Sequence, residues 1–224
     1  FDKNMRIAYD LDGTLYDSLS HVFRVDSIIR ERLGYPKISL DDYRKNFQSH
    51  DWKKFYRDLG IREEDIDQVI SLFIKENRIG EPPSLIHGAR EALYATEKAI
   101  GRENVYIITN EPLDGVKLRF ERDGLTHFLQ NVDNPFSGKT NEIFKLAQDN
   151  LKSPFVYIGD ITSDGEACLE ARKMGSDNVR FFGMTHPYAI TPKDLMERFI
   201  AQNSNFARVL ESLADVHKIW DQLL

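Results

Sequence analysis

The chain has 224 residues, of which 41% are hydrophobic and 29% charged, a composition that excludes an intrinsically disordered or membrane-embedded protein. Its formal net charge of −6 argues against general binding to nucleic acid or to an anionic membrane. The single cysteine, Cys168, excludes an internal disulfide and favours a reducing, cytoplasmic compartment, and the sequence shows no signal peptide.

The first element is a short buried strand at residues 6–9, followed at once by Asp10-Leu11-Asp12-Gly13-Thr14. Because open α/β sheets bind their ligands at the carboxyl ends of strands, both carboxylates are expected to face one site. A carboxylate there can attack phosphorus and carry the phosphoryl group as an aspartyl-phosphate, while its neighbour acts as acid and then base. The alternative is a solvated Asp-rich turn, since Asp and Gly are common turn residues.

Residues 17–84 carry a helical pattern that ends in the linker Gly80-Glu81-Pro82-Pro83-Ser84. Four helices are expected, near residues 22–33, 40–47, 52–59 and 63–74. An insert of this length with its own amphipathic helices predicts a small all-helical domain, a cap, at 17–84. Residues 1–16 and 85–224 then form the core domain.

The segment after residue 85 alternates between helical and extended patterns. Strands are expected near 105–108, 128–132, 155–158 and 178–182, and helices near 88–99, 116–124, 140–151, 164–174 and 193–201. This alternation predicts an α/β fold with a doubly wound, mainly parallel sheet, a Rossmann-like core with helices on both faces.

Polar residues follow several of these strands and should meet at one edge of the sheet. They are Asp10 and Asp12, then Thr109 and Asn110, then Asp160 with Asp164 one helical turn beyond it. So many carboxylates need a cation, because two unit charges about 4 Å apart repel by about 4 kcal/mol at an effective dielectric constant near 20. Oxygen-only ligands, without a Cys or His cluster, favour Mg²⁺ over zinc.

Lys139 begins a predicted helix and could hold a phosphoryl group from the side away from the metal. Its alternatives are an ordinary surface lysine or the last part of a P-loop. A P-loop would need glycine at position 133, where the chain has Asp133, so that reading is set aside.

These motifs together resemble the haloacid dehalogenase-like (HAD) superfamily of hydrolases, over essentially the whole chain. The four family motifs correspond to residues 10–14, Thr109, Lys139 and residues 159–164. The presence of Asp12 separates the chain from the dehalogenases. Two positions depart from the family pattern, since Thr140 and His87 stand where relatives usually carry Pro, and this weakens a match to any one subfamily.

The resemblance implies roles for the motif residues. Asp10 would be the nucleophile and Asp12 the acid/base, with Thr109 and Lys139 holding the phosphoryl group. Mg²⁺ would be bound by Asp10, the backbone carbonyl of Asp12 and Asp160, with Asp164 in support. The helical insert would be a cap that closes over the active site. The tail would form a short strand at 207–210 and a helix through Val216, Ile219 and Leu223, although its periodicity also allows one continuous helix with a partner-binding stripe.

Substrate choice is expected to come from the cap. Tyr16, just after the first motif, is the preferred candidate, and Asn110 is a further candidate for substrate binding. The other cap candidates are His21, Arg24, Tyr43, Arg44, Lys45, Trp52 and Lys53. His50, His127 and His217 are interpreted as ordinary residues, and His186 is placed near the catalytic edge.

The leading hypothesis is a Mg²⁺-dependent phosphatase that hydrolyses a small phosphorylated metabolite through an aspartyl-phosphate. The alternatives are a phosphomutase with the same motifs and a non-catalytic phosphate-binding or scaffold protein, which would not need a proton donor. We expect a monomer or homodimer that binds neither nucleic acid nor membranes.

Overall fold

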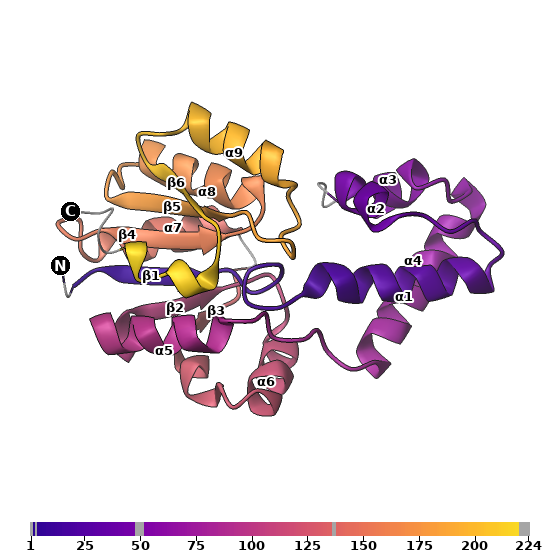
Figure 1. Ribbon diagram of the computed structural model, residues 1–224, viewed down its shortest axis with the longest axis horizontal. Helices are drawn as coiled ribbons and strands as arrows, with labels where there is room; N and C mark the ends of the chain where they lie inside the picture. Colours follow the sequence, from indigo (N-terminus) through magenta and orange to yellow (C-terminus); the bar gives the residue numbers. More distant parts are fainter. Residues whose placement is uncertain (1, 3, 48–51, 136–137, 220–224) are drawn as a thin grey trace.

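The computed structural model describes residues 2, 4–47, 52–135 and 138–219. It consists of a layered α/β core and a group of helices at one end of it (Figure 1). The strands are β1 (Arg6–Tyr9), β2 (Val105–Ile108), β3 (Val132–Asp133), β4 (Phe155–Gly159), β5 (Val179–Met184) and β6 (Ala207–Leu210). The helices are α1 (Ser18–Arg32), α2 (Leu40–Asn46), α3 (Trp52–Asp58), α4 (Ile66–Ile79), α5 (Ala89–Ile100), α6 (Leu113–Arg122), α7 (Lys139–Gln148), α8 (Thr162–Lys173) and α9 (Lys193–Gln202). The 3₁₀ helices are η1 (Glu63–Asp65), η2 (Arg102–Asn104), η3 (Thr126–Asn131) and η4 (Leu213–Asp215). Among the helices of these residues, none has both the length and the apolar character needed to cross a bilayer.

The six strands form one parallel sheet in the order β3-β2-β1-β4-β5-β6, which confirms the predicted doubly wound α/β fold. The chain runs from β1 to β2 and β3 on one side of β1, and then crosses from β3 to β4, β5 and β6 on the other side, so the direction of winding reverses at β1. Tyr9 pairs with Ile107 of β2 and with Ile158 of β4. The residues that follow these three strands therefore emerge together at the switch point, where sheets of this kind bind ligands.

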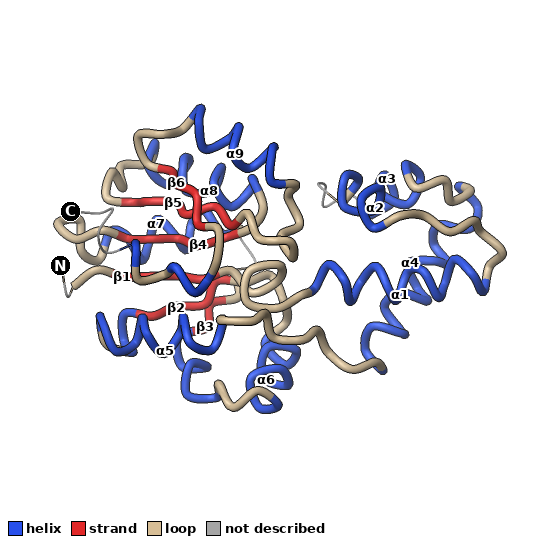
Figure 2. The backbone as a smooth tube through the Cα atoms, in the orientation of Figure 1, coloured by secondary structure: helices blue, strands red, loops and turns tan. Residues whose placement is uncertain are grey.

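Both faces of the sheet are covered, which explains why the central strands β1, β2 and β4 are largely apolar. Ile7 and Tyr9 pack in the cluster of α5 and α6, whereas Ala8 packs in the cluster of α7, α8 and α9. Figure 2 shows α5 and α6 on one side of the strands and α8 and α9 on the other. The hydroxyl of buried Tyr9 is hydrogen bonded to Thr96 Oγ1 at 2.6 Å, so this polar atom is not buried without a partner.

One predicted strand is wrong over most of its length. Residues 126–131 form the 3₁₀ helix η3, and only Val132 and Asp133 pair with β2. Three hydrogen bonds hold the turn: the Phe128 amide donates to Leu125 O, and the Asn131 side chain donates to Arg102 O and Val105 O. The aromatic side chain of Phe128 is buried in the core by a turn rather than by a strand.

The tail does not form one continuous helix. Ala207–Leu210 pairs in parallel with β5, and Val216 and Ile219 are buried against the core. Their apolar side chains are therefore covered by the fold itself, and not left as a stripe for a partner. The end of the predicted tail helix, with Leu223, lies outside the described residues.

Helices α1–α4 pack around a second hydrophobic cluster, to which Ile161 and Ile190 also contribute, at the end of the core toward which the strands point (Figure 1). A buried carboxylate, Asp26, lies inside this cluster and accepts hydrogen bonds from the hydroxyls of Tyr43 and Tyr56. The linker at residues 80–84, which leads from α4 back to the core, is held by Arg122. The Arg122 guanidinium donates hydrogen bonds to Pro82 O and Pro83 O. The helical content agrees with a cap, and the name cap is used below for helices α1–α4 and the turns between them. The domain boundaries at 16/17 and 84/85 stay a prediction.

Asp26 is expected to make the free energy of unfolding depend on pH. Burial raises the pKa of its carboxyl from 3.8 to about 6, against the hydrogen bonds from Tyr43 and Tyr56. The folded protein thus binds this proton more tightly than the unfolded chain, so the stability from this group is fully present below pH ~4 and lost as the pH rises through about 6. The free energy of unfolding of the wild type, minus that of Asp26→Asn, should fall by about 2 kcal/mol between pH 4 and pH 7.

Urea unfolding at a series of pH values measures this difference. The control is Asp41→Asn, which changes an exposed carboxylate of α2 in the same helical unit. A difference between wild type and Asp26→Asn that does not vary with pH would contradict the prediction.

Candidate active site

Three buried carboxylates converge at the switch point of the sheet. Asp10 follows β1, Asp160 follows β4, and Asp164 lies in the first turn of α8. One oxygen of each lies within 4.8 Å of the others. The structure thus brings together three of the carboxylates that the sequence placed at this edge.

A single ammonium group bridges two of these carboxylates. Lys139 Nζ lies 2.8 Å from Asp10 Oδ1 and 2.8 Å from Asp164 Oδ1. Burial disfavours the charged lysine, but the two carboxylates more than offset this, and the pKa of Lys139 lies well above its usual range. Lys139 therefore stays protonated at neutral pH and holds Asp10 in place.

One lysine does not balance three carboxylates. Burial raises the pKa of Asp10 to about 7, against the attraction of Lys139. Burial, together with the charges of Asp10 and Asp164, raises the pKa of Asp160 well above its usual range. The cluster therefore needs protons or a further cation to remain buried.

The donor set fits a hard divalent cation. Asp164 Oδ2 is buried and has no hydrogen-bond partner within the described part of the chain. An orphaned buried oxygen beside two more carboxylates is the kind of oxygen-only environment that Mg²⁺ or Ca²⁺ occupies. These three aspartates could hold a metal ion.

Gly13 allows the loop after β1 to lie close to the three clustered carboxylates. Its φ is +77°, and a Cβ at this position would lie 2.1 Å from Asp160 Oδ2. Asp160 is in turn oriented by Thr14 Oγ1, which donates to Oδ1 at 3.2 Å, and by the Ile190 amide, which donates to Oδ2 at 2.6 Å. The glycine is required both by the backbone conformation and by the closeness of the carboxylate.

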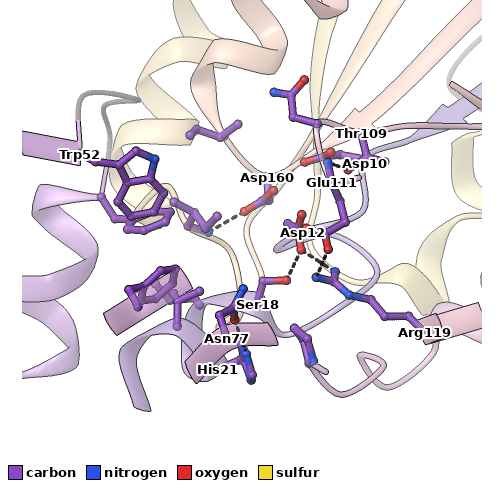
Figure 3. Close-up of a pocket in the computed structure, with 18 of the residues that line it drawn as sticks. Asp10, Asp12, Ser18, His21, Trp52, Asn77, Thr109, Glu111, Arg119 and Asp160 are labelled. Atoms are coloured by element: carbon purple, nitrogen blue, oxygen red, sulfur yellow. Dashed lines mark hydrogen bonds and ion pairs between the residues drawn. The ribbon is translucent and has the colours of Figure 1, made fainter. Parts of the chain in front are cut away.

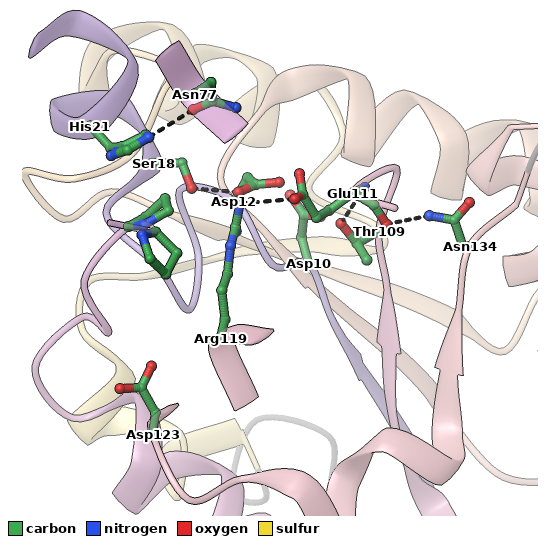
Figure 4. Close-up of polar contacts among 12 residues, drawn as sticks. Asp10, Asp12, Ser18, His21, Asn77, Thr109, Glu111, Arg119, Asp123 and Asn134 are labelled. Atoms are coloured by element: carbon green, nitrogen blue, oxygen red, sulfur yellow. Dashed lines mark hydrogen bonds and ion pairs between the residues drawn. The ribbon is translucent and has the colours of Figure 1, made fainter. Parts of the chain in front are cut away.

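Asp12 lies outside the three-carboxylate cluster and has partners of its own. Its Oδ1 accepts hydrogen bonds from Ser18 Oγ and from Arg119 Nη1, the latter at 2.7 Å. Arg119 also pairs with Glu111 through Nη2 at 3.3 Å, and its side chain is only 7% exposed. Figure 4 shows Ser18 and Arg119 converging on Asp12 from two different helices. The predicted metal contact of Asp12, through its backbone carbonyl, stays a prediction.

Sequence reasoning missed Ser18, Glu111 and Arg119. Glu111 follows Thr109 by two residues, so the argument from strand ends could have included it. Arg119 had no such signal, because it lies within a helix that also exposes other charged residues. The burial of Arg119 results from the packing of α6 against the loop after β1, which the sequence pattern does not reveal.

Thr109 and Asn110 lie where they were predicted, at the end of β2. The Thr109 amide donates to Asp133 O at 3.0 Å, and its Oγ1 accepts from the Glu111 amide at 3.0 Å. Since the hydroxyl acts as acceptor in this bond, its proton is free to be donated. Asn110 is exposed at the rim.

A cavity of about 390 Å³ lies between this edge of the sheet and the helical unit (Figure 3). Its wall on the core side is formed by Asp10, Asp12, Thr109, Asn110, Glu111, Arg119, Lys139, Asp160, Ile161 and Ile190. The wall on the cap side is formed by Ser18, Leu19, His21, Val22, Phe47, Trp52, Phe73 and Asn77, with Pro83 from the linker. Of the cap candidates, His21 and Trp52 line the cavity.

The remaining cap candidates do not line the cavity. Tyr43 is buried within the cap on Asp26, Lys53 pairs with Asp67, and Arg44 donates to Pro187 O. Arg24 and Lys45 are likewise absent from the cavity wall.

The expectation that Tyr16 contacts a substrate is wrong. Its side chain is fully buried and stacks on Phe120 at 6.3 Å between ring centroids. A bridge between Tyr16 and Leu85 turns the residue toward the core at the point where the chain enters the cap. Tyr16 therefore supports Arg119, whose guanidinium lies 5.5 Å from its ring centroid, and not a ligand.

The histidines outside the cap do not line the cavity. His127 pairs with Glu97 and packs on Phe128, and His217 is exposed. Burial lowers the pKa of His186 to about 4, and its Nδ1 accepts from the Tyr188 amide. His50 lies outside the described residues.

Comparisons with known proteins agree with the fold described above. The model of a family described as haloacid dehalogenase-like hydrolase matches residues 5–172. No curated protein gives a significant match. Among solved structures, a HAD family hydrolase from Deinococcus radiodurans R1, with bound phosphate and sodium, has a TM-score of 0.74 at 20% identity, covering 99% of this chain and 97% of that one.

Two other solved structures share the fold to a similar degree. A haloacid dehalogenase-like family protein from Streptococcus pneumoniae has a TM-score of 0.72 at 15% identity and 99% coverage of both chains. A predicted phosphoglycolate phosphatase from Haemophilus somnus 129PT has a TM-score of 0.71 at 16% identity, covering 98% of this chain and 99% of that one.

Gly13→Ala is expected to weaken cation binding, because the new methyl group would displace Asp160 from the cluster. Calorimetric titration with Mg²⁺ should show a loss of affinity of about 10- to 100-fold, as for other groups that orient metal ligands. The matched control is Gly34→Ala, which has a similar φ of +75° but nothing within 4 Å of its Cβ. Equal Mg²⁺ affinities of the two variants would contradict the prediction.

Proposed function

The chain belongs to the haloacid dehalogenase-like hydrolase family, and from this premise we propose that it is a Mg²⁺-dependent phosphatase acting on a small phosphomonoester through an aspartyl-phosphate on Asp10. The observation that carries the proposal is the position of Asp10, a buried carboxylate bridged by Lys139 at the floor of a cavity. Asp12 faces the same cavity two residues later and supplies a second carboxylate. The phosphatase names of neighbours with this fold, and the phosphate bound in one of them, add support.

In the first step, an Asp10 oxygen attacks phosphorus and forms a new P–O bond. The ester P–O bond breaks as Asp12 gives a proton to the leaving oxygen, so an alcohol departs and Asp12 is left ionised. Lys139 Nζ and the Thr109 hydroxyl are placed to donate to the phosphoryl oxygens, where negative charge is concentrated.

In the second step, ionised Asp12 takes a proton from water while the water oxygen attacks phosphorus. The bond between phosphorus and Asp10 breaks, orthophosphate is released, and both aspartates return to their starting states. Ser18 and Arg119 keep Asp12 in one position through both steps, because both bind the same oxygen, Oδ1. The other oxygen of Asp12, Oδ2, is then left to give the proton to the leaving group and to take one from water.

We assign the metal to Asp10, Asp160 and Asp164, with the backbone carbonyl of Asp12. When bound, Mg²⁺ would offset the repulsion between the carboxylates and the phosphate dianion. A cytoplasmic location, and a monomeric or homodimeric state, stay predictions.

Asp10→Asn should abolish turnover without unfolding the protein, because it removes the nucleophile but keeps the shape of the side chain. Phosphate release from a panel of phosphomonoesters measures the loss, and circular dichroism checks the fold. Asp133→Asn is the control, since Asp133 ends strand β3, which pairs with β2 and not with β1, and does not line the cavity. Undiminished phosphate release by Asp10→Asn would refute the proposal, and an isomeric phosphate as the wild-type product would indicate a mutase.

Removal of the metal is a second test. EDTA should stop phosphate release by the wild type until Mg²⁺ is restored.

Asp12→Ala should reduce kcat by about 10² to 10⁴, the usual contribution of a general acid. The loss should be smaller for p-nitrophenyl phosphate than for an alkyl phosphate, because a good leaving group needs no proton. Steady-state rates with both substrates test this point. An equal loss on both would show that Asp12 does not protonate the leaving group.

A further inference from the structure

The cap side of the cavity carries no formal charge at neutral pH among the described residues. Its eight residues include no Asp, Glu, Lys or Arg. The one titratable residue is His21, and burial lowers the pKa of its imidazole. His21 Nε2 is hydrogen bonded to Asn77 Oδ1 at 2.7 Å, so the neutral ring is already paired (Figure 3).

The two cations on the core side are already engaged. Lys139 is held by Asp10 and Asp164, and Arg119 is held by Asp12 and Glu111. A substrate that carried a second anionic group beyond its phosphate would therefore enter the cap side without a counter-ion from the described lining residues. Such a group would lose hydration without an opposite charge on the cap side to compensate the loss.

Aromatic rings form the far wall of the cavity. Phe47 and Trp52 meet edge to face at 5.5 Å between centroids, and Trp52 and Phe73 lie 5.8 Å apart. The indole of Trp52 is 40% exposed although it borders this cavity. A cavity wall of packed rings that includes a partly exposed indole is suited to stacking a flat ring of a ligand. The volume of about 390 Å³ lies in the range of pockets that hold whole small molecules, so it exceeds what a phosphate group needs.

We propose that the substrate is a phosphomonoester whose leaving group is uncharged and carries an aromatic ring that stacks on Trp52. The hydrolytic part of this statement rests on the proposed function, whereas the binding part does not. Phosphomonoesters with a second anionic group, such as phosphoglycolate, are then poor substrates.

Three probes separate the ring from the charge. Benzyl phosphate and ethyl phosphate release alcohols of similar acidity and differ in the ring, and phosphoglycolate adds a carboxylate without a ring. We expect kcat/KM to be highest for benzyl phosphate and lowest for phosphoglycolate. Trp52→Ala should raise KM for benzyl phosphate by about tenfold or more and leave the values for ethyl phosphate unchanged.

Two control variants show whether an effect of Trp52→Ala comes from loss of its aromatic ring or from damage to the fold. Trp52→Phe retains a ring and should preserve most of the preference for benzyl phosphate. Tyr94→Ala truncates another exposed aromatic residue, on α5 away from the cavity, and should change nothing. The inference is overturned if phosphoglycolate is the best substrate, or if Trp52→Ala keeps the preference for benzyl phosphate.

Binding to the Asp10→Asn variant distinguishes failure of the subsite from failure of the chemistry. If calorimetry shows Trp52-dependent binding of benzyl phosphate while the wild type hydrolyses none of the probes, the phosphatase proposal fails and the aromatic subsite stands. If hydrolysis depends on Asp10 but benzyl phosphate is no better a substrate than ethyl phosphate, the proposal of an aromatic subsite fails. The proposal that the protein is a phosphatase is then retained. No binding of benzyl phosphate overturns the subsite.

Discussion

Buried negative charge exceeds buried positive charge where Asp10, Asp160 and Asp164 meet, and this imbalance governs the site. Asp10, Asp160 and Asp164 lie together out of solvent, and within the described residues one ammonium group, that of Lys139, bridges two of them. Burial of carboxylates is costly unless cations compensate it, so the site is poised to accept a metal ion. The sheet makes this cluster possible because β1 and β4 are neighbours and deliver Asp10 and Asp160 to the same place.

The core and the cap contribute different kinds of side chain to the cavity. The core supplies the carboxylates and both engaged cations, whereas the described cap residues supply aromatic, aliphatic and neutral polar side chains. Asp12 connects the two parts, since Ser18 is the first residue of α1 and Arg119 belongs to α6. The position of the proposed acid/base is thus tied to the beginning of the cap. In this account the reaction type is set by the core and the choice of leaving group by Trp52 and its neighbours.

The sequence predicted the parts of the site that depend on local order along the chain. Asp10, Thr109 and Asp160 each follow an apolar strand, so their meeting could be inferred from the topology of a doubly wound sheet. Arg119 could not be found in this way, because its burial depends on how α6 packs against Tyr16 and Asp12. Tyr16 was misjudged for a related reason: its position next to the motif suggested the cavity, but pairing with Leu85 turns it inward. The short 3₁₀ segment η3 was likewise decided by side-chain bonds to the backbone that the apolar pattern does not reveal.

Asp10 is proposed to carry the phosphoryl group during turnover, and chemical trapping tests this role most directly. Wild-type protein is mixed with Mg²⁺ and benzyl phosphate, quenched during turnover and treated with borohydride, which reduces an acyl phosphate to an alcohol. Peptide mass spectrometry should then find homoserine at position 10, only when Mg²⁺ and substrate are both present. Turnover without any reduced residue at position 10, or with the reduced residue at another aspartate, would contradict the account.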